Sequence, residues 1–222
     1  MISTFDVRLK TPFSCILAGP SRAGKTTFVF NLLSQADYLF QKKPDYVIYY
    51  YNQWQPLFDQ MKSKHLVDEF KNFVPTKKEL ESLSSKKKGK NNICIIIDDF
   101  MQVQSEDISE VFTALSHHLN LNCIYITQNL FSKNNRYMRD MSLSATYLVL
   151  FKNPRDSSQI VHLAKQFAPG RVQSVVNAFR ELTKKPYSYV LFDLHQASEE
   201  EIRMRTHIFS HEKPLICVAI PT

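Results

Sequence analysis

The chain has few glycines and few cysteines, and it lacks long apolar runs. Four glycines occur in 222 residues, and the four cysteines form no C-x-x-C pair. Their spacing indicates neither a zinc site nor a disulfide framework, and it favours a reducing, intracellular compartment. No apolar run approaches the roughly 20 residues of a membrane span, and the first residues lack the apolar core of a secretory signal. We therefore expect a soluble intracellular protein with no membrane partner.

The length and composition are those of an ordinary globular protein. A chain of 222 residues suits one domain, 1–222, with a sizeable hydrophobic core. Hydrophobic residues make up 44% of the chain and charged residues 22%. The net charge of +7 indicates an acidic partner, and nucleic acid is the first candidate.

Apolar runs alternate with helical patterns, which predicts an α/β fold with a mainly parallel central sheet flanked by helices. The runs are rich in β-branched and aromatic residues, which is typical of strands buried on both faces. We expect strands at 13–18, 45–51, 93–97, 122–126, 145–151 and 188–192. We expect helices at 25–40, 77–86, 105–119, 156–167 and 171–182.

Residues 19–26 fit the phosphate-binding pattern G-x-x-x-x-G-K-[ST], between the first expected strand and the first expected helix. In that arrangement backbone N–H groups of the loop and of the helix start point at phosphates. Lys25 would reach the β- and γ-phosphates, and the Thr26 hydroxyl would ligate Mg²⁺. The pattern predicts binding of ATP or another nucleoside triphosphate by Gly19, Pro20, Ser21, Arg22, Ala23, Gly24, Lys25, Thr26 and Thr27.

A second motif supplies carboxylates. The apolar run 93–97 is followed directly by Asp98 and Asp99, as in a Walker B strand. A strand end holds a carboxylate rigidly opposite the phosphate loop, so we expect Asp98 on the metal side. Asp99 would orient and polarise the attacking water, or it caps the following turn.

Polar and basic residues follow the next two strands. Gln128 comes just after the strand at 122–126, where an amide can sense the γ-phosphate or form a turn. Three arginines near the strand at 145–151 are candidates for a finger that reaches a neighbouring subunit's γ-phosphate, with surface ion pairs as the alternative. They are Arg136, Arg139 and Arg155.

Four blocks of sequence together resemble the viral genome-packaging ATPases of the FtsK–HerA superfamily, nearest to the poxvirus-type and Polinton/Maverick-like branch. The resemblance covers about residues 10–210. The blocks are Gly-Pro-Ser-Arg-Ala-Gly-Lys-Thr, Ile-Ile-Ile-Asp-Asp-Phe, Ile-Thr-Gln-Asn-Leu-Phe and Leu-Phe-Lys-Asn-Pro-Arg-Asp.

The resemblance implies an ASCE-type, RecA-like P-loop NTPase fold and a homo-oligomeric ring, a hexamer or a pentamer. It further implies ATP-driven translocation of double-stranded DNA into a preformed capsid in an infected cell, with association with the virion. Gln128 falls on the family's sensor position. For the finger expected in trans, Arg136 and Arg139 come first, with Arg155 as a rival. Asp99 stands where glutamate is commoner, although an Asp-Asp pair also occurs in this branch.

The resemblance also implies that DNA lies in a basic central channel and is held through its phosphates. We expect no appended DNA-binding or membrane domain, so contacts with capsid vertex proteins would use this domain's own surface. Candidates for DNA contact are the 86–90 segment, which is otherwise a solvated charged loop, and Lys133, Lys184 and Lys185.

Other functions fit less well. A regulatory GTPase is excluded because the chain has no Asn-Lys-x-Asp string and no aspartate three residues ahead of a glycine. A small-molecule kinase conflicts with the Asp-Asp pair and the polar sensor strand, which indicate hydrolysis by water. A structural nucleic-acid-binding protein would explain the charge but not the coincidence of Lys25, Thr26, Asp98 and Gln128. A DNA-translocating ATPase for repair, segregation or transposition needs the same motor and stays open.

Overall fold

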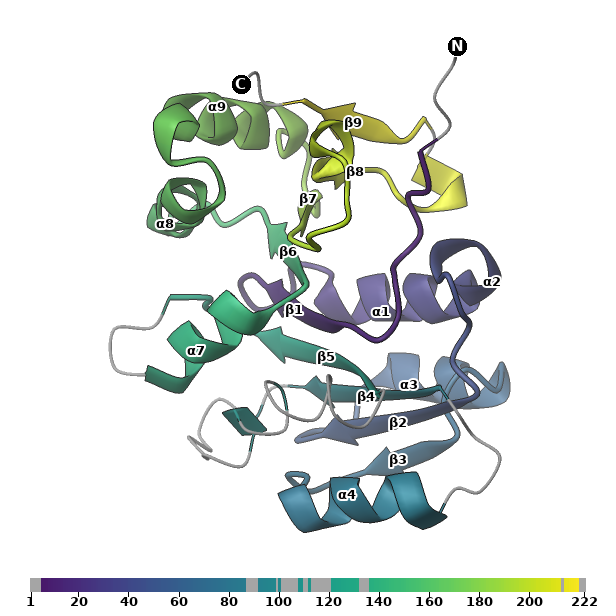
Figure 1. The fold of residues 1–222 in the computed structure, drawn as a ribbon. Coiled ribbons are helices and arrows are strands. Elements are labelled where there is room, and N and C mark those ends of the chain that lie inside the picture. Colours follow the sequence, from purple (N-terminus) through teal and green to yellow (C-terminus); the bar gives the residue numbers. More distant parts are fainter. Residues whose placement is uncertain are drawn as a thin grey trace.

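The computed structural model describes residues 5–86, 92–98, 100, 108–109, 112, 121–131, 136–212 and 214–219. Its centre is a nine-stranded sheet (Figure 1). Across the sheet the strands follow the order β3 (Glu69–Lys71), β2 (Tyr46–Tyr51), β4 (Ile93–Asp98), β5 (Leu121–Thr127), β1 (Ser14–Ala18), β6 (Tyr147–Phe151), β7 (Tyr189–Asp193), β8 (Met204–Thr206) and β9 (Ile216–Val218).

The strands from β3 to β6 pair in parallel, and β7, β8 and β9 add an antiparallel edge. The predicted α/β class with a mainly parallel sheet is therefore confirmed. The strand β5 lies between β1 and β4, in register with both. The carboxyl ends of these three strands consequently meet at one edge of the sheet, where open α/β sheets bind their ligands.

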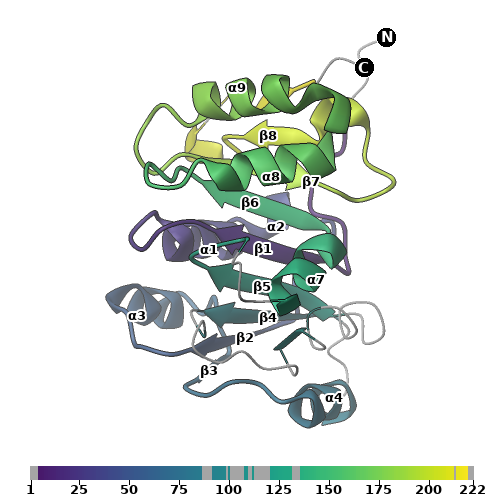
Figure 2. The same ribbon diagram turned by 90° about the vertical axis from the view of Figure 1, so that its left-hand side faces the viewer.

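Helices cover both faces of the sheet (Figure 2). One face packs against α4 (Lys77–Lys86), α7 (Arg136–Ser144), α8 (Ser158–Phe167) and α9 (Val172–Leu182). The other packs against α1 (Lys25–Ser34), α2 (Ala36–Leu39) and α3 (Pro56–Ser63). Because successive strand residues point to opposite faces, the central strands feed both cores. Ile16 of β1 belongs to the first core, and Cys15 and Leu17 belong to the second.

Several elements differ from the sequence-based expectations. The expected helix 25–40 is two helices, because the backbone at Gln35 leaves the helical region (φ −116°, ψ 25°). The helices α3 and α7 and the three-residue strands β3, β8 and β9 were not predicted. The expected helix 105–119 lies mostly outside the described residues. The three residues described in this range are Ile108, Ser109 and Phe112, and they are buried.

The chain has four cysteines. Three are buried within central strands, one is exposed, and all four carry free thiols; they are Cys15, Cys94, Cys123 and Cys217. Within the described part of the chain, no cluster of three or more histidine, cysteine or acidic side chains could hold a metal ion. Nor does any helix described there have the length and apolar character needed to cross a bilayer.

Candidate functional site

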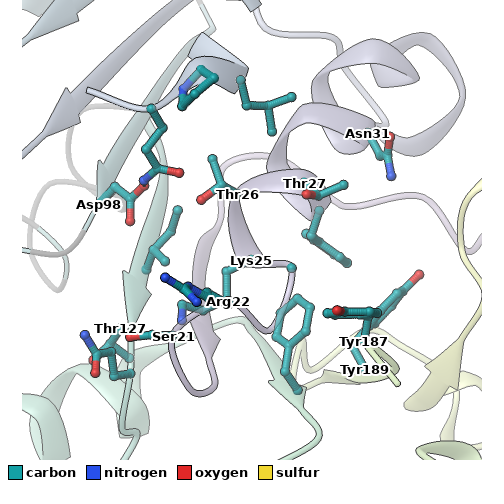
Figure 3. A pocket seen from close by; sticks show the side chains of 18 of the residues that line it. Ser21, Arg22, Lys25, Thr26, Thr27, Asn31, Asp98, Thr127, Tyr187 and Tyr189 are labelled. Carbon is teal, nitrogen blue, oxygen red and sulfur yellow. The ribbon is translucent and has the colours of Figure 1, made fainter. Parts of the chain in front are cut away.

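The phosphate-binding pattern forms the loop from β1 to α1, at the carboxyl edge of the sheet (Figure 3). The loop borders a cavity of about 910 Å³. Six of the nine residues predicted to bind nucleotide line this cavity: Ser21, Arg22, Gly24, Lys25, Thr26 and Thr27. Gly19, Pro20 and Ala23 shape the loop without lining the cavity.

Glycine is required at the two glycine positions of the pattern for different physical reasons. A Cβ atom on Gly19 would lie 2.6 Å from the Cβ atom of Phe151, closer than side chains approach each other. Gly24 has a left-handed backbone (φ 98°), and so does Arg22 (φ 63°). Alternation of right- and left-handed residues turns successive N–H groups toward one concave side, which makes an anion-binding surface.

Lys25 begins α1 and folds back over its own loop. Its Nζ donates hydrogen bonds to the carbonyl oxygens of Gly19 (2.6 Å) and Pro20 (2.9 Å). No side chain among the described residues caps the start of α1. The first N–H groups of a helix have no partner inside the helix, and the helix dipole favours an anion there. The loop thus offers an ammonium group and backbone donors to a negatively charged ligand.

Asp98 ends β4 on the opposite side of the cavity and is 4% exposed. The Tyr49 hydroxyl donates to its Oδ2 (2.7 Å), and the Gln55 amide lies 3.5 Å from the same oxygen. Burial, and then the charge of Asp98, raise the pKa of Tyr49 well above its usual range, so the hydroxyl keeps its proton. A neutral donor therefore orients a buried carboxylate at the cavity. Tyr49 was not singled out from the sequence.

The strand β5 brings its carboxyl end between the loop and Asp98. The Gly19 N–H donates to the Thr127 carbonyl oxygen (3.3 Å), which ties the loop to this strand. Thr127 and the half-buried Gln128 line the cavity. The structure thus brings together four side chains that the sequence singled out, namely Lys25, Thr26, Asp98 and Gln128.

Asp99, Lys87–Lys90 and Lys133 lie outside the described residues, as does the side chain of Arg136. Arg139 on α7 and Arg155 after β6 are exposed and do not line the cavity. Lys184 and Lys185 are also exposed, and Lys184 pairs with Glu181 (2.6 Å).

A further wall of the cavity was not anticipated. It comes from the C-terminal part of the chain and is largely aromatic; it comprises Phe151, Tyr187, Tyr189, Phe209, His211 and Glu212. Phe28 of α1 packs edge-on against three of these rings, with centroids 4.9–5.9 Å apart. The Tyr189 hydroxyl donates to Glu212 (2.6 Å), and burial followed by this bond raises the pKa of Tyr189. These contacts hold the wall firmly beside the helix that carries the loop.

No protein-family model and no curated protein matches the chain. One similar solved structure is that of EssC (ATPases 2 and 3) from Geobacillus thermodenitrificans, with 15% sequence identity and a TM-score of 0.45. The similarity covers 68% of this chain and 34% of the other, so the chain spans about a third of the length of that structure.

Proposed function

We propose that this chain is an ATPase of the P-loop type that uses the cavity between loop 19–27 and Asp98. One observation carries the proposal. A loop with the phosphate-binding pattern, a buried carboxylate and a polar residue from the intervening strand all face one cavity at the carboxyl edge of the sheet. These groups bind phosphates, hold a metal ion and position water in P-loop enzymes.

The residues fit a magnesium nucleotide. Mg²⁺ takes one or two protein oxygens and completes its shell with phosphate and water, so a cluster of three acidic residues is not required. Thr26 and Asp98 are the residues that would hold it, and the bond from Tyr49 fixes the carboxylate. When bound, the ion neutralises charge on the phosphates.

The chain's own groups then have separate tasks. Lys25 exchanges the loop carbonyls for phosphate oxygens and holds them against the start of α1. Asp99 and Gln128 orient the attacking water. An arginine of a neighbouring subunit stabilises the charge on the transferring phosphoryl group; Arg136 and Arg139 are first candidates and Arg155 is a rival. That role accords with the position of Arg139 and Arg155 outside their own subunit's cavity.

At the finer level, we propose a homo-oligomeric ring that translocates double-stranded DNA and packages a viral genome into a preformed capsid. The net charge of +7 and the sequence blocks that resemble packaging ATPases support this proposal. A translocase for repair, segregation or transposition would use the same motor.

The DNA-motor proposal is tested by ATP turnover with and without linear double-stranded DNA over a salt series. A motor that grips phosphates shows strong stimulation by DNA, and added salt weakens it. Turnover that is indifferent to DNA contradicts the motor and leaves an ATPase with another partner. For the finger, inactive Lys25→Ala protein is mixed with a variant lacking one arginine. Recovery of turnover indicates that the arginine acts across subunits.

A further inference from the structure

The cavity extends in two directions from the phosphate loop, and the proposed function uses one of them. Asp98 and Thr127 lie to one side of Lys25, and Tyr187 and Tyr189 lie to the other (Figure 3). A triphosphate whose terminal phosphate is held near Asp98 leaves the loop on the tyrosine side. The nucleoside part of the ligand therefore requires a surface there.

Tyr187 can provide the surface for the nucleoside part of the ligand. It precedes β7, and its side chain is 71% exposed although it lines the cavity. Its Cβ atom is 4.0 Å from where a Cβ atom of Gly24 would be, so it stands directly beside the phosphate loop. Its ring packs against no other aromatic ring of the described residues.

The backbone of Tyr187 is unusual for a bulky residue. Its φ of 60° is left-handed, a conformation that costs of the order of 1 kcal/mol and that clusters at ligand clamps. This strained backbone is not compensated by packing of the ring, because the side chain stays exposed. A bound planar ligand would cover it.

Asn31 provides a polar group at the same end. It lies one turn beyond Thr27 on α1, so both residues share the helix face that lines the cavity. Its side-chain amide makes no hydrogen bond to the described residues. An asparagine amide offers one donor and one acceptor side by side, which match the N6 and N7 edge of adenine.

We propose that Tyr187 stacks on the base of the bound nucleotide and that Asn31 reads the polar edge of that base. The inference rests on the proposed function and adds the nucleoside subsite to it. Stacking accepts any base, since every base has a π-face. Tyr187 therefore supplies affinity for the nucleoside, and Asn31 supplies the preference for adenine.

The test compares two ligands that share the phosphate chain. Binding of ATP and of inorganic tripolyphosphate, each with Mg²⁺, is measured by calorimetry for wild type, Tyr187→Asn and Tyr187→Phe. Asparagine tolerates a left-handed backbone, so it removes the ring without added strain. Tyr38→Asn is the matched control, since Tyr38 is 80% exposed and lies on α2 outside the cavity.

We expect Tyr187→Asn to bind ATP ~10-fold more weakly, as for the loss of one stacked base. Tripolyphosphate affinity stays unchanged, and Tyr187→Phe and Tyr38→Asn behave as wild type. Asn31→Ala reduces the preference for ATP over GTP. Unchanged ATP affinity in Tyr187→Asn, or an equal loss for both ligands, overturns the inference and leaves the proposed function standing. If wild type binds neither ligand, the proposed function itself fails.

Discussion

The hydrogen bond from Tyr49 to Asp98 allows a sharp test of how the proposed metal-binding carboxylate is held. Tyr49→Phe removes one oxygen and leaves the ring in its contacts with Phe58 and Phe70, at centroid distances of 4.7 and 5.8 Å. The lost bond is 2.7 Å long, fully buried, and made to a carboxylate. Such bonds contribute about 1.5–3 kcal/mol, and we expect that loss in the free energy of unfolding.

The same substitution should loosen Mg²⁺. Removing the partner that orients a carboxylate ligand typically lowers metal affinity ~10-fold or more. We therefore expect the Mg²⁺ concentration for half-maximal ATP turnover to rise ~10-fold in Tyr49→Phe. Urea unfolding measures the stability change, and a Mg²⁺ titration at saturating ATP measures the change at the site.

Tyr50→Phe is the matched control, because it is the next residue of β2 and points to the other face of the sheet. Its hydroxyl donates to Glu79 (3.1 Å), which also accepts a bond from Lys71 (2.7 Å). We expect a smaller loss, about 0.5–1.5 kcal/mol, because this bond is longer and only partly buried and Lys71 still pairs with Glu79. We expect no change in Mg²⁺ dependence. If both variants shift the Mg²⁺ dependence alike, or if neither does, Tyr49 has no orienting role at Asp98.

Three further predictions concern the framework of the site. Gly19→Ala should cost about 1–3 kcal/mol of stability and weaken nucleotide binding through steric overlap with Phe151. Gly170→Ala is the control, because a Cβ atom there would have no atom within 4 Å, and it should have neither effect. Equal losses of stability for the two variants in urea unfolding would refute this. Asp193→Ala should cost about 3–5 kcal/mol, because it leaves Arg205 (1% exposed) as a buried unpaired charge; a loss below ~1 kcal/mol would contradict it. In the native protein a thiol reagent at pH 8 should modify Cys217 alone, since Cys217 is exposed and the other three thiols are buried. Rapid reaction of Cys15, Cys94 or Cys123 in the native protein would contradict their assigned burial.

The sequence predicted the parts of the fold that long apolar runs encode. All six expected strands occur, with ends that move by up to two residues. The three missed strands have only three residues each, and two of them carry charged side chains. Arg205 illustrates the reason: it is buried in β8 because it pairs with Asp193 of β7, the antiparallel strand beside it. A charge in so short a segment predicts a surface loop unless its partner is known.

Some residues of the candidate site could likewise be predicted from the sequence, and others could not. The phosphate loop is contiguous in sequence, and Asp98 follows a strand of the same parallel sheet, so both could be placed in advance. Tyr49 depends on which strand lies next to β4, and Tyr187 depends on the antiparallel return of β7 beside β6. Strand order and direction follow from packing over the whole chain. A local pattern therefore did not indicate these two tyrosines.

The central claim is that the cavity between the loop and Asp98 binds and hydrolyses ATP. The most direct measurement is phosphate release from Mg²⁺-ATP by wild type, Lys25→Ala, Asp98→Asn and Lys62→Ala. Lys62 is an exposed lysine on α3 that does not line the cavity, so it controls for lost charge. We predict that Lys25→Ala and Asp98→Asn stay folded and lose turnover, while Lys62→Ala keeps it. Full turnover in folded Lys25→Ala would contradict the account.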